Sequence, residues 1–357
     1  MKIVSVVGAR PQFIKSAPVS KAISDFGFDE YKIHTGQHYD YKMSQVFFEE
    51  LGLPEPSINL GIGSGTHAFQ TGQMLIAIEP VLLSQNPDIV LVYGDTNTTL
   101  AGALVAAKLN IKLAHVEAGL RSYNRQMPEE HNRVLTDHCS DLLFCPTQTA
   151  VDNLTHEGIQ QGVHLVGDTM YDATLQFGKI AKHHSKILQT LGLKPKKYLL
   201  ATIHRAYNTD YPAILASIFS AFQQVDDIII FPIHPRTSHA VTDAHLNLPD
   251  NVRVIDPMGY LDMLILEMNA RIIMTDSGGM QKEAYFFKVP CLTLRPETEW
   301  VETIKSGWNQ IVGTDPVLIV DSIRKHDCPD TPPQLLFGDG HAAQKILSVL
   351  INNKAEE

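Results

Sequence analysis

The sequence predicts an α/β protein made of two Rossmann-like domains, each built on a parallel sheet. The chain has 357 residues, more than a single hydrophobic core usually holds. Short uninterrupted apolar runs alternate with stretches of helical periodicity, as in parallel sheets that helices cover on both faces. This alternation occurs in two consecutive sets, so we expect two domains whose sheets face each other across a cleft.

The first set predicts an N-terminal domain over residues 1–170. Its apolar runs end in Gly, Asp, Thr or His, and they cover residues 2–7, 31–35, 88–96, 111–119, 141–147 and 163–169. The stretch 97–110 has the periodicity of a helix. A last helix, at about 340–357, could pack back onto this domain.

The second set predicts a C-terminal domain over residues 171–339. Its apolar runs cover residues 198–205, 227–235, 252–257, 271–279 and 289–294. The stretches 212–225 and 280–288 between them have helical periodicity. Parallel sheets bind ligands outside the carboxyl ends of their strands, so we expect functional residues where these runs give way to polar residues.

Composition and charge exclude several classes of protein. The formal net charge is −10 and no run of Lys and Arg stands out, so nucleic acid is not expected as a partner. A diphosphate could still be held by a few Arg, Lys and backbone N–H groups. The four cysteines, Cys139, Cys145, Cys291 and Cys328, form no C-x-x-C pair, which argues against a zinc ribbon and a disulfide framework.

The cellular location follows from what the sequence lacks. No apolar run reaches the length of a membrane span, and the run at residues 3–7 is too short for a signal peptide. Reduced, mostly buried thiols fit the cytosol. We therefore expect a cytoplasmic protein with no membrane partner.

The sharpest motif is DSGGMQKE at 276–283, where a strand runs directly into a helix. Glycines let the backbone approach a ligand closely, and the free N–H groups of a helix start attract a diphosphate. Glu283, about one turn into the helix, could accept hydrogen bonds from ribose hydroxyls. The alternative is a capped helix with Ser277 as N-cap. The adjacent Gly278 and Gly279 favour phosphate binding, because a simple cap does not need both.

The loop after the first strand, GARPQFIK at 8–15, carries two cations. It lacks the G-x-G-x-x-G spacing, so no dinucleotide cofactor is expected. Arg10 can donate in a fork to phosphate or carboxylate oxygens, and Lys15 adds a point charge further along the helix. The alternative is a solvated basic pair.

Three carboxylates are candidate acid–base groups. Asp95 and Glu117 each end an apolar run, and Glu129 lies in a Pro-Glu-Glu segment. Acids at the ends of nearby strands can converge and repel, which moves a pKa into the range of general acid–base catalysis. The alternative is that Asp95 caps the next helix and Glu117 is an exposed turn residue. An acid directly after a buried run favours function, because its burial is costly unless satisfied. For Glu129 alone both interpretations stay open.

Two histidines, His204 and His234, also lie at strand ends. Each could contact phosphate or transfer a proton near neutral pH. The sequence contains no H-E-x-x-H motif and no close His/Asp pairing, so we expect no metal site.

Six segments together resemble the non-hydrolysing UDP-N-acetylglucosamine 2-epimerases. They are GARPQFIKSAP, YGDTNTTLAGALVAA, HVEAGLRS, MPEEHNR, an HR pair after a strand, and TDSGGMQKEA. The resemblance spans residues 1 to about 315. It implies a fold like that of the GT-B glycosyltransferases, an active site in the interdomain cleft, a UDP-sugar substrate, no redox cofactor and a homodimer.

The resemblance also implies a reaction and a set of site residues. In the family, the enzyme breaks the anomeric C–O bond and removes the carbon 2 proton, releasing UDP and a 2-acetamidoglucal; re-addition with protonation from the opposite face gives the manno isomer. Asp95, Glu117 and Glu129 match the catalytic carboxylates, and His204 matches a histidine that contacts the diphosphate. The remaining matches are Arg10, Ser277, Gly278, Gly279 and Glu283 in the UDP site, and Lys15, Arg133 and His234 elsewhere in the cleft.

The chain departs from the family pattern at several positions. Trp300 stands where many members have Arg, and Met258 and Met263 stand where the better-known epimerases have Gln and Phe beside the nucleotide. Some members hold an activating second substrate molecule with an Arg-Gln pair. Here Phe69 precedes Gln70, which argues against such activation.

Several functions remain open at this point. The first hypothesis is 2-epimerisation of UDP-N-acetylglucosamine to UDP-N-acetylmannosamine. The GARPQFIK, MPEE and ETEW segments resemble the branch that acts on UDP-2,3-diacetamido-2,3-dideoxyglucuronic acid, so the same reaction on that sugar is the second. A GT-B glycosyltransferase, a hydrolysing epimerase and a nucleotide-sugar sensor also stay open.

Overall fold

The structure is a computed structural model that describes residues 1–37, 51–325, 329 and 334–355. It contains two compact units. The N-terminal unit comprises Met1–Leu175 together with Leu335–Glu357, and the C-terminal unit comprises Gln176–Gln334. Each unit is built on one parallel sheet, so the predicted fold class of two Rossmann-like units is confirmed.

Seven parallel strands form the sheet of the N-terminal unit, in the order β3-β2-β1-β4-β5-β6-β7. The strands are β1 (Lys2–Val7), β2 (Asp29–His34), β3 (Ile58–Asn59), β4 (Ile89–Tyr93), β5 (Leu113–Val116), β6 (Leu142–Cys145) and β7 (Val163–Leu165). Every residue of β4, β5 and β6 is buried, as expected for strands covered on both faces. The chain order reverses at β1, which pairs with both β2 and β4. Such a switch point is where open α/β sheets bind ligands.

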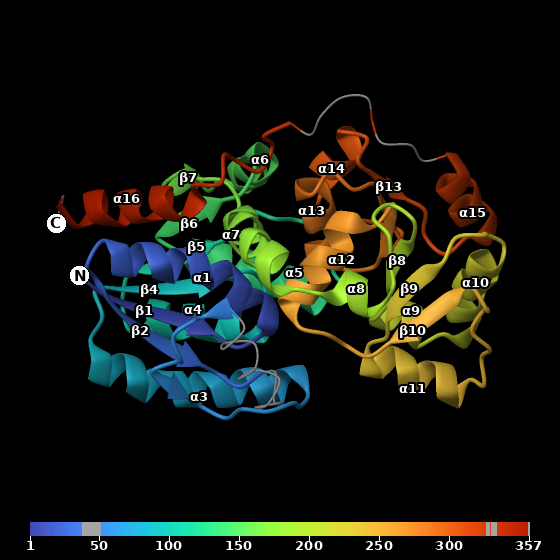
Figure 1. The fold of residues 1–357 in the computed structure, drawn as a ribbon. Coiled ribbons are helices and arrows are strands. Elements are labelled where there is room, and N and C mark those ends of the chain that lie inside the picture. The colour runs from blue at the N-terminus through green and yellow to red at the C-terminus, as the bar shows by residue number, and fades with distance from the viewer. Residues whose placement is uncertain (38–50, 326–328, 330–333, 356–357) are drawn as a thin grey trace. The chain divides into compact units, whose positions relative to one another are not determined.

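Helices lie on both faces of this sheet (Figure 1). They are α1 (Arg10–Asp25), α3 (His67–Gln85), α4 (Asn97–Lys108), α5 (Pro128–Cys139), α6 (Gln148–His156) and α16 (Ala342–Ala355), and α7 (Thr169–His184) begins in this unit. The C-terminal helix α16 packs against α1. Asp172 accepts hydrogen bonds from the main-chain N–H groups of Ala342 and Ala343, at 3.1 and 2.8 Å. This carboxylate therefore joins the start of α16 to the N-terminal unit.

The C-terminal unit has a six-stranded parallel sheet in the order β10-β9-β8-β11-β12-β13. Its strands are β8 (Leu199–Thr202), β9 (Ile229–Pro232), β10 (Val252–Ile255), β11 (Ile272–Thr275), β12 (Cys291–Thr293) and β13 (Asn309–Ile311). Its helices are α8 (Ile187–Thr190), α9 (Ala206–Thr209), α10 (Pro212–Gln223), α11 (Pro235–Asp243), α12 (Tyr260–Asn269), α13 (Gly278–Phe286), α14 (Val301–Lys305) and α15 (Pro316–Lys325). Leu199 and Ile272 belong to one core cluster, and the next residues, Leu200 and Ile273, belong to another. Successive strand residues thus pack on opposite faces of the sheet.

Two short edge strands were not predicted. They are β3, with two residues, and β13, with three. A period-two pattern needs more residues than these to be visible, and both strands lie at an edge of their sheet.

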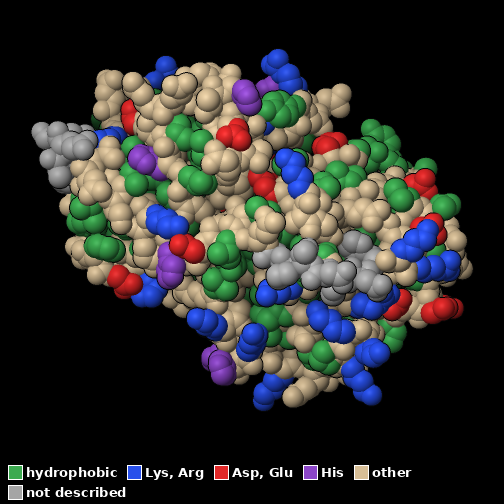
Figure 2. Space-filling view, turned by 90° about the horizontal axis from the view of Figure 1, so that it is seen from above, with side chains coloured by type: hydrophobic (Ala, Val, Ile, Leu, Met, Phe, Trp, Pro, Cys, Tyr) green, Lys and Arg blue, Asp and Glu red, His purple; other side chains and the backbone are tan. Residues whose placement is uncertain are grey.

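The surface of the molecule carries an uneven distribution of charge. On the face shown in Figure 2, Lys and Arg side chains gather over one part of the surface, although the chain has a formal net charge of −10. Such a gathering is not visible as a basic run in the sequence. Over the described ranges, no helix is both long and apolar enough to span a membrane.

Candidate active site

Asp95 and Glu117 follow the ends of two adjacent strands in the sheet of the N-terminal unit. Tyr93 at the end of β4 pairs with Val116 at the end of β5, and both strands are parallel. Only Gly94 separates β4 from Asp95, and Glu117 follows β5 directly. The two carboxylates therefore emerge at the carboxyl edge of adjacent strands, where parallel sheets place their functional residues.

Glu117 is buried and held in an unusual backbone conformation. Its φ is +74°, in the left-handed region, which costs a non-glycine residue about 1–2 kcal/mol. The side chain of Lys15 in α1 donates a hydrogen bond to the Glu117 carboxylate, and the pair is largely shielded from solvent. The alternative that Glu117 is an exposed turn residue is therefore wrong. A buried carboxylate needs such a cation to offset its lost hydration.

Asp95 is paired with a cation from a different helix. Arg133 Nη2 in α5 lies 2.5 Å from Asp95 Oδ2. Asn132 Nδ2, from the same helix, donates to the main-chain oxygen of Asp95 at 3.0 Å. The cap of α4 is Thr96, whose hydroxyl accepts from the Thr99 N–H group, so the alternative of Asp95 as a helix cap is wrong.

The two adjacent glutamates of the Pro-Glu-Glu segment lie in different environments. Glu129 lies in the first turn of α5, four residues before Arg133, so the two side chains share one side of the helix. Glu130 is buried, and its carboxylate accepts from the N–H groups of Ser122 and Tyr123 at 3.0 and 2.8 Å. Glu130 also lies 3.1 Å from Arg133 Nη1, so its carboxylate is engaged by both the loop before α5 and Arg133.

The opening loop is held by a buried residue, Gln12, whose role was not predicted from the sequence. Gln12 is buried, and its side-chain oxygen accepts from the Gly8 and Ala9 N–H groups at 2.8 and 3.0 Å. Its amide nitrogen donates to the main-chain oxygen of Tyr93 at 2.8 Å. Gln12 thereby joins the loop after β1 to the end of β4. A Gln at the third position of a helix, where capping boxes place one, is the signal that could have found it. Arg10, the first residue of α1, is exposed.

In the C-terminal unit, the Ser-Gly-Gly motif is the first turn of α13. Ser277 is the N-cap, and its hydroxyl accepts from the Met280 N–H group at 3.4 Å. Gly278 and Gly279 are already helical, so the turn expected before the helix is part of it. The N–H groups of a first helical turn have no intrahelical partner and can bind an anion. A Cβ on Gly278 would lie 2.4 Å from Glu299 Oε1, so a larger residue there requires the Glu299 side chain or the turn to move.

His204 lies next to this turn and is held by a buried aspartate. Asp276, at the end of β11, accepts from the His204 N–H group at 2.9 Å and from the Arg205 N–H group at 2.9 Å. Burial lowers the pKa of His204 below its usual value, although the Asp276 charge acts in the opposite direction. The His234 ring lies 5.6 Å from the His204 ring, and burial lowers its pKa as well. Both rings are therefore biased toward the neutral form until an anion binds nearby.

His234 also has a local structural role. It is the N-cap of α11, where its Nδ1 accepts from the Arg236 N–H group at 3.1 Å. Only an unprotonated Nδ1 can accept, which leaves Nε2 as the donor of this ring.

The remaining predicted residues of the C-terminal unit have partners within it. Tyr260 in α12 donates to Glu283 Oε1 at 2.7 Å, so one carboxylate oxygen of Glu283 is already engaged. Met258 and Met263 are half-buried and pack on the core cluster that contains Leu200. Trp300, at the position where many relatives of the family have Arg, lies with its ring 3.9 Å from Lys282 Nζ in α13. This is a cation–π contact that ties the Trp300 loop to the helix of the Ser-Gly-Gly motif.

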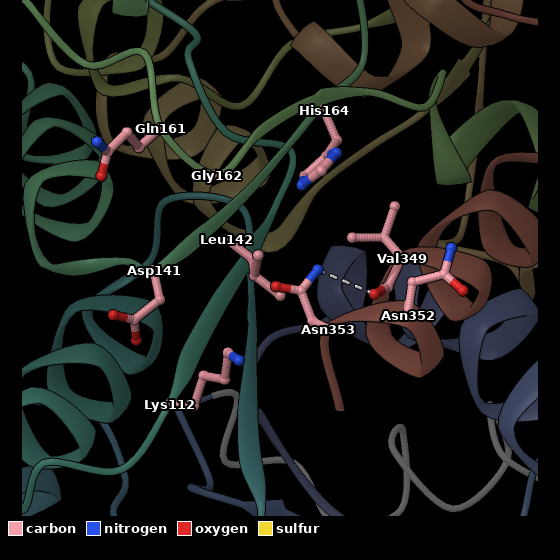
Figure 3. Close-up of a pocket in the computed structure, with 9 residues that line it drawn as sticks. All are labelled: Lys112, Asp141, Leu142, Gln161, Gly162, His164, Val349, Asn352 and Asn353. Carbon is pink, nitrogen blue, oxygen red and sulfur yellow. Dashed lines mark hydrogen bonds between the residues drawn. The ribbon is translucent and has the colours of Figure 1, made fainter. Parts of the chain in front are cut away.

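A cavity of about 500 Å³ lies at the opposite edge of the N-terminal sheet (Figure 3). Its lining includes Lys112, Asp141 and Gly162, which immediately precede β5, β6 and β7. The cavity is therefore at the amino ends of the strands, away from Asp95 and Glu117, and we do not assign the reaction to it. Among the residues that the structure describes, no group of three or more His, Cys, Asp or Glu side chains could hold a metal ion.

Comparisons with known proteins identify relatives over the whole chain. The family model described as UDP-N-acetylglucosamine 2-epimerase matches residues 21–351. A UDP-N-acetylglucosamine 2-epimerase homolog of Methanococcus maripaludis is 56% identical over 99% of this chain and 100% of its own length. The UDP-2,3-diacetamido-2,3-dideoxy-D-glucuronate 2-epimerase of Pseudomonas aeruginosa is 47% identical over 98% of this chain and 99% of its own.

Solved structures show the same fold. The crystal structure of the Methanocaldococcus jannaschii UDP-GlcNAc 2-epimerase with UDP-GlcNAc and UDP has a TM-score of 0.92 and 46% identity, and it covers 99% of this chain and 100% of that one. The calicheamicin glycosyltransferase, at 13% identity and a TM-score of 0.54, covers 98% of this chain and 94% of that one. The fold is therefore of the GT-B-like kind that epimerases and glycosyltransferases share.

Proposed function

The chain belongs to the UDP-N-acetylglucosamine 2-epimerase family and catalyses the 2-epimerisation of UDP-N-acetylglucosamine, and we propose that it does so by eliminating UDP and adding it back. In the elimination, a base takes the carbon 2 proton, the carbon 1–carbon 2 double bond forms, and the carbon 1–oxygen bond breaks with its electrons leaving on the diphosphate. In the addition, the diphosphate oxygen attacks carbon 1 and an acid protonates carbon 2 on the other face. These two steps need two proton-transfer groups and a firm hold on UDP.

The observation that best supports this mechanism is that Asp95 and Glu117 follow adjacent strands and that each pairs with a cation. The positive charges of Lys15 and Arg133 reduce the electrostatic repulsion between the two carboxylates. Each cation can also adjust its position as its carboxylate gains or loses a proton during the reaction. We assign the proton transfers at the sugar to Asp95, Glu117 and Glu129. The neighbouring Glu130 is excluded from this role, because its carboxylate holds the loop before α5.

We assign the hold on UDP to the C-terminal unit. The first-turn N–H groups at Gly278 and Gly279 suit the diphosphate, and His204 is near enough to the same strand ends to donate to it. A proton gained by His204 would stabilise the leaving diphosphate, whose negative charge rises as the carbon 1–oxygen bond breaks. The carboxylate of Glu283 can accept from the ribose.

The diacetamido-uronic acid sugar is a second candidate substrate. The observation that favours it is the relative from Pseudomonas aeruginosa, which is as similar to this chain as the relatives named for UDP-N-acetylglucosamine at 46% identity. Proton NMR of the products from each UDP-sugar, at equal enzyme and substrate concentrations, tests the choice. A manno product from UDP-N-acetylglucosamine at the higher kcat/KM supports the first candidate, and the reverse order supports the second.

We propose that the protein is a homodimer that uses one face of α3. Phe69, Ile76 and Leu83 are 62%, 68% and 62% exposed, and they recur every seven residues, so they share one side of the helix. An exposed apolar stripe of this kind is typical of a protein interface. Light scattering should give the mass of a dimer for the wild type and of a monomer for Ile76→Lys. Equal masses for both would place the interface elsewhere.

We propose that the protein acts in the cytoplasm. Cys139, Cys145 and Cys291 are free thiols, and Cys328 lies outside the described residues. Burial raises the pKa of Cys145 and of Cys291, so both stay protonated and unreactive. Free thiols of this kind persist in a reducing compartment.

A further inference from the structure

A network of polar and charged side chains adjoins the carboxylates of the N-terminal unit. It contains the buried residues His115 in β5, Asp137 in α5 and Arg121, together with the exposed Glu157. His115 Nδ1 lies 2.7 Å from Asp137 Oδ1, and Arg121 Nη1 lies 2.7 Å from Asp137 Oδ2. Arg121 Nη2 also donates to Glu157 Oε2 at 2.6 Å. The side chains of His115 and Asp137 have no exposed surface, so their interaction is not weakened by water.

Both ring nitrogens of His115 have hydrogen-bond partners. Its Nε2 lies 2.7 Å from the main-chain oxygen of Gly94, and its Nδ1 faces the Asp137 carboxylate. Both partners are acceptors, so the ring bridges β4 and α5 through its two nitrogens. Burial acts to raise the pKa of Asp137, but the hydrogen bonds and charges of His115 and Arg121 outweigh it and lower that pKa below its usual range. Asp137 is therefore a stabilised carboxylate at the centre of the network.

The two central side chains contact the segments that carry the catalytic acids. His115 bonds to Gly94, the residue before Asp95. Asp137 Oδ2 accepts from the Gly119 N–H group at 3.1 Å, two residues after Glu117. The turns after β4 and β5 are thus joined through one histidine ring and one carboxylate.

The same network reaches the third acid through α5. Asp137 belongs to this helix, which also carries Glu129 and the Arg133 partner of Asp95. Its bond to His115 fixes α5 against β5. A shift of α5 along the sheet would therefore move Glu129 and Arg133 together relative to Glu117.

Close contacts restrict the backbone of the turns that follow β4 and β5. A Cβ on Gly94 would lie 3.2 Å from Glu117 Oε2 and 3.3 Å from Lys15 Nζ, so the Gly94 peptide lies against the Lys15–Glu117 pair. Glu117 keeps an unfavourable φ of +74°, which persists only where surrounding contacts impose it. The bonds from His115 to Gly94 and from Asp137 to Gly119 lie on either side of Glu117 and supply such contacts.

We propose that His115 and Asp137 are positioning residues that set the separation of the Asp95 and Glu117 carboxylates for the two proton transfers. The inference rests on the proposed function, which gives these acids their role at carbon 2. Neither side chain touches the substrate. They act by holding the two strand-end turns and α5 in one arrangement, and a displacement of about 1 Å at such a site costs about 100-fold in rate.

The test compares Asp137→Asn and His115→Gln with the wild-type protein in the 2-epimerisation of UDP-N-acetylglucosamine. We expect kcat to fall about 100-fold in each variant. We expect KM and the dissociation constant of UDP to change less than about twofold, because the UDP-binding groups lie in the C-terminal unit. A folded variant that keeps a kcat near the wild-type value, or that loses activity through KM alone, would overturn the inference.

Asp172→Asn is the matched control. It makes the same change at another buried carboxylate of the N-terminal unit, one that bonds to the start of α16. We expect it to lower the melting temperature while kcat stays near the wild-type value. If both network variants fail to fold, the network serves stability and the inference is overturned. Wild-type protein without epimerase activity would instead overturn the proposed function, and this inference with it.

Discussion

Arg133 Nη2 lies 2.5 Å from Asp95 Oδ2, although 38 residues separate them in the chain. Lys15 and Glu117 form the equivalent pair on the neighbouring strand, across 102 residues. Each strand-end acid thus receives a cation from a helix that packs nearby. The cations lower the free-energy cost of placing two carboxylates at the ends of adjacent strands.

Glu117→Gln should abolish turnover and leave UDP binding intact. The change keeps the shape of the side chain but removes the carboxylate that Lys15 pairs with, so no proton can be taken or returned at this position. The groups to which we assign UDP binding lie in the C-terminal unit and are untouched. Steady-state rates and calorimetric titration with UDP measure the two effects. Glu79→Gln, at an exposed residue of α3, is the control, and wild-type turnover in Glu117→Gln would remove this acid from the mechanism.

Gly278→Ala should weaken UDP binding by at least about tenfold, the cost of losing one charge-assisted hydrogen bond. The added methyl group would lie 2.4 Å from Glu299 Oε1 and 3.2 Å from Trp300 Nε1, so these side chains or the first turn of α13 must shift. We expect the turn to shift, so that its N–H groups no longer converge on the proposed diphosphate site. Calorimetry with UDP measures the loss. Gly72→Ala, where an added methyl group meets nothing within 4 Å, should bind UDP like the wild type; unchanged affinity in Gly278→Ala would contradict the assignment.

UDP should raise the pKa of His204. Burial lowers this pKa in the free protein, and a diphosphate beside the ring would favour the protonated form. Because the folded pKa lies below the unfolded value, the unfolded chain binds more protons between the two values, and the free energy of unfolding falls as pH drops through that window. Bound UDP should reduce this loss. Histidine NMR titrations with UDP and with uridine test the shift, and equal pKa values in the two would contradict a diphosphate contact.

The rate should depend hyperbolically on substrate concentration. Gln70 is buried, its side-chain nitrogen donates to the Gly63 main-chain oxygen at 3.0 Å, and its oxygen accepts from Asn97 Nδ2 at 2.8 Å. Its amide is therefore committed within the N-terminal unit, and the preceding Phe69 cannot form the ionic contact that an Arg would supply. Initial rates over a wide range of UDP-sugar concentrations provide the measurement. A sigmoidal curve would indicate that a second substrate molecule activates the enzyme after all.

The sequence predicted the strand ends well because buried parallel strands have uninterrupted apolar runs. That pattern located Asp95, Glu117 and the Ser-Gly-Gly motif, and the residue types suggested acid–base chemistry and phosphate binding. The partners of these residues were not predictable in the same way. Lys15 meets Glu117 only because α1 packs against β4, the strand next to β5, and the periodicity of the sequence does not show this packing.

Two further features depend on atomic contacts that a single sequence does not contain. Glu129 and Glu130 are identical in type, and only the bonds of Glu130 to the Ser122 loop distinguish their roles. In the sequence, His115 looks like any other residue of a buried strand. Its hydrogen bonds to Gly94 and Asp137 form only because the fold places β4, β5 and α5 next to one another.

The most direct test of the account is proton NMR of the protein with UDP-N-acetylglucosamine in deuterated water. Elimination and re-addition through Asp95 and Glu117 exchange the carbon 2 proton with solvent. We therefore expect UDP-N-acetylmannosamine to appear with deuterium at carbon 2. A manno product that keeps its original proton at carbon 2 would contradict the account.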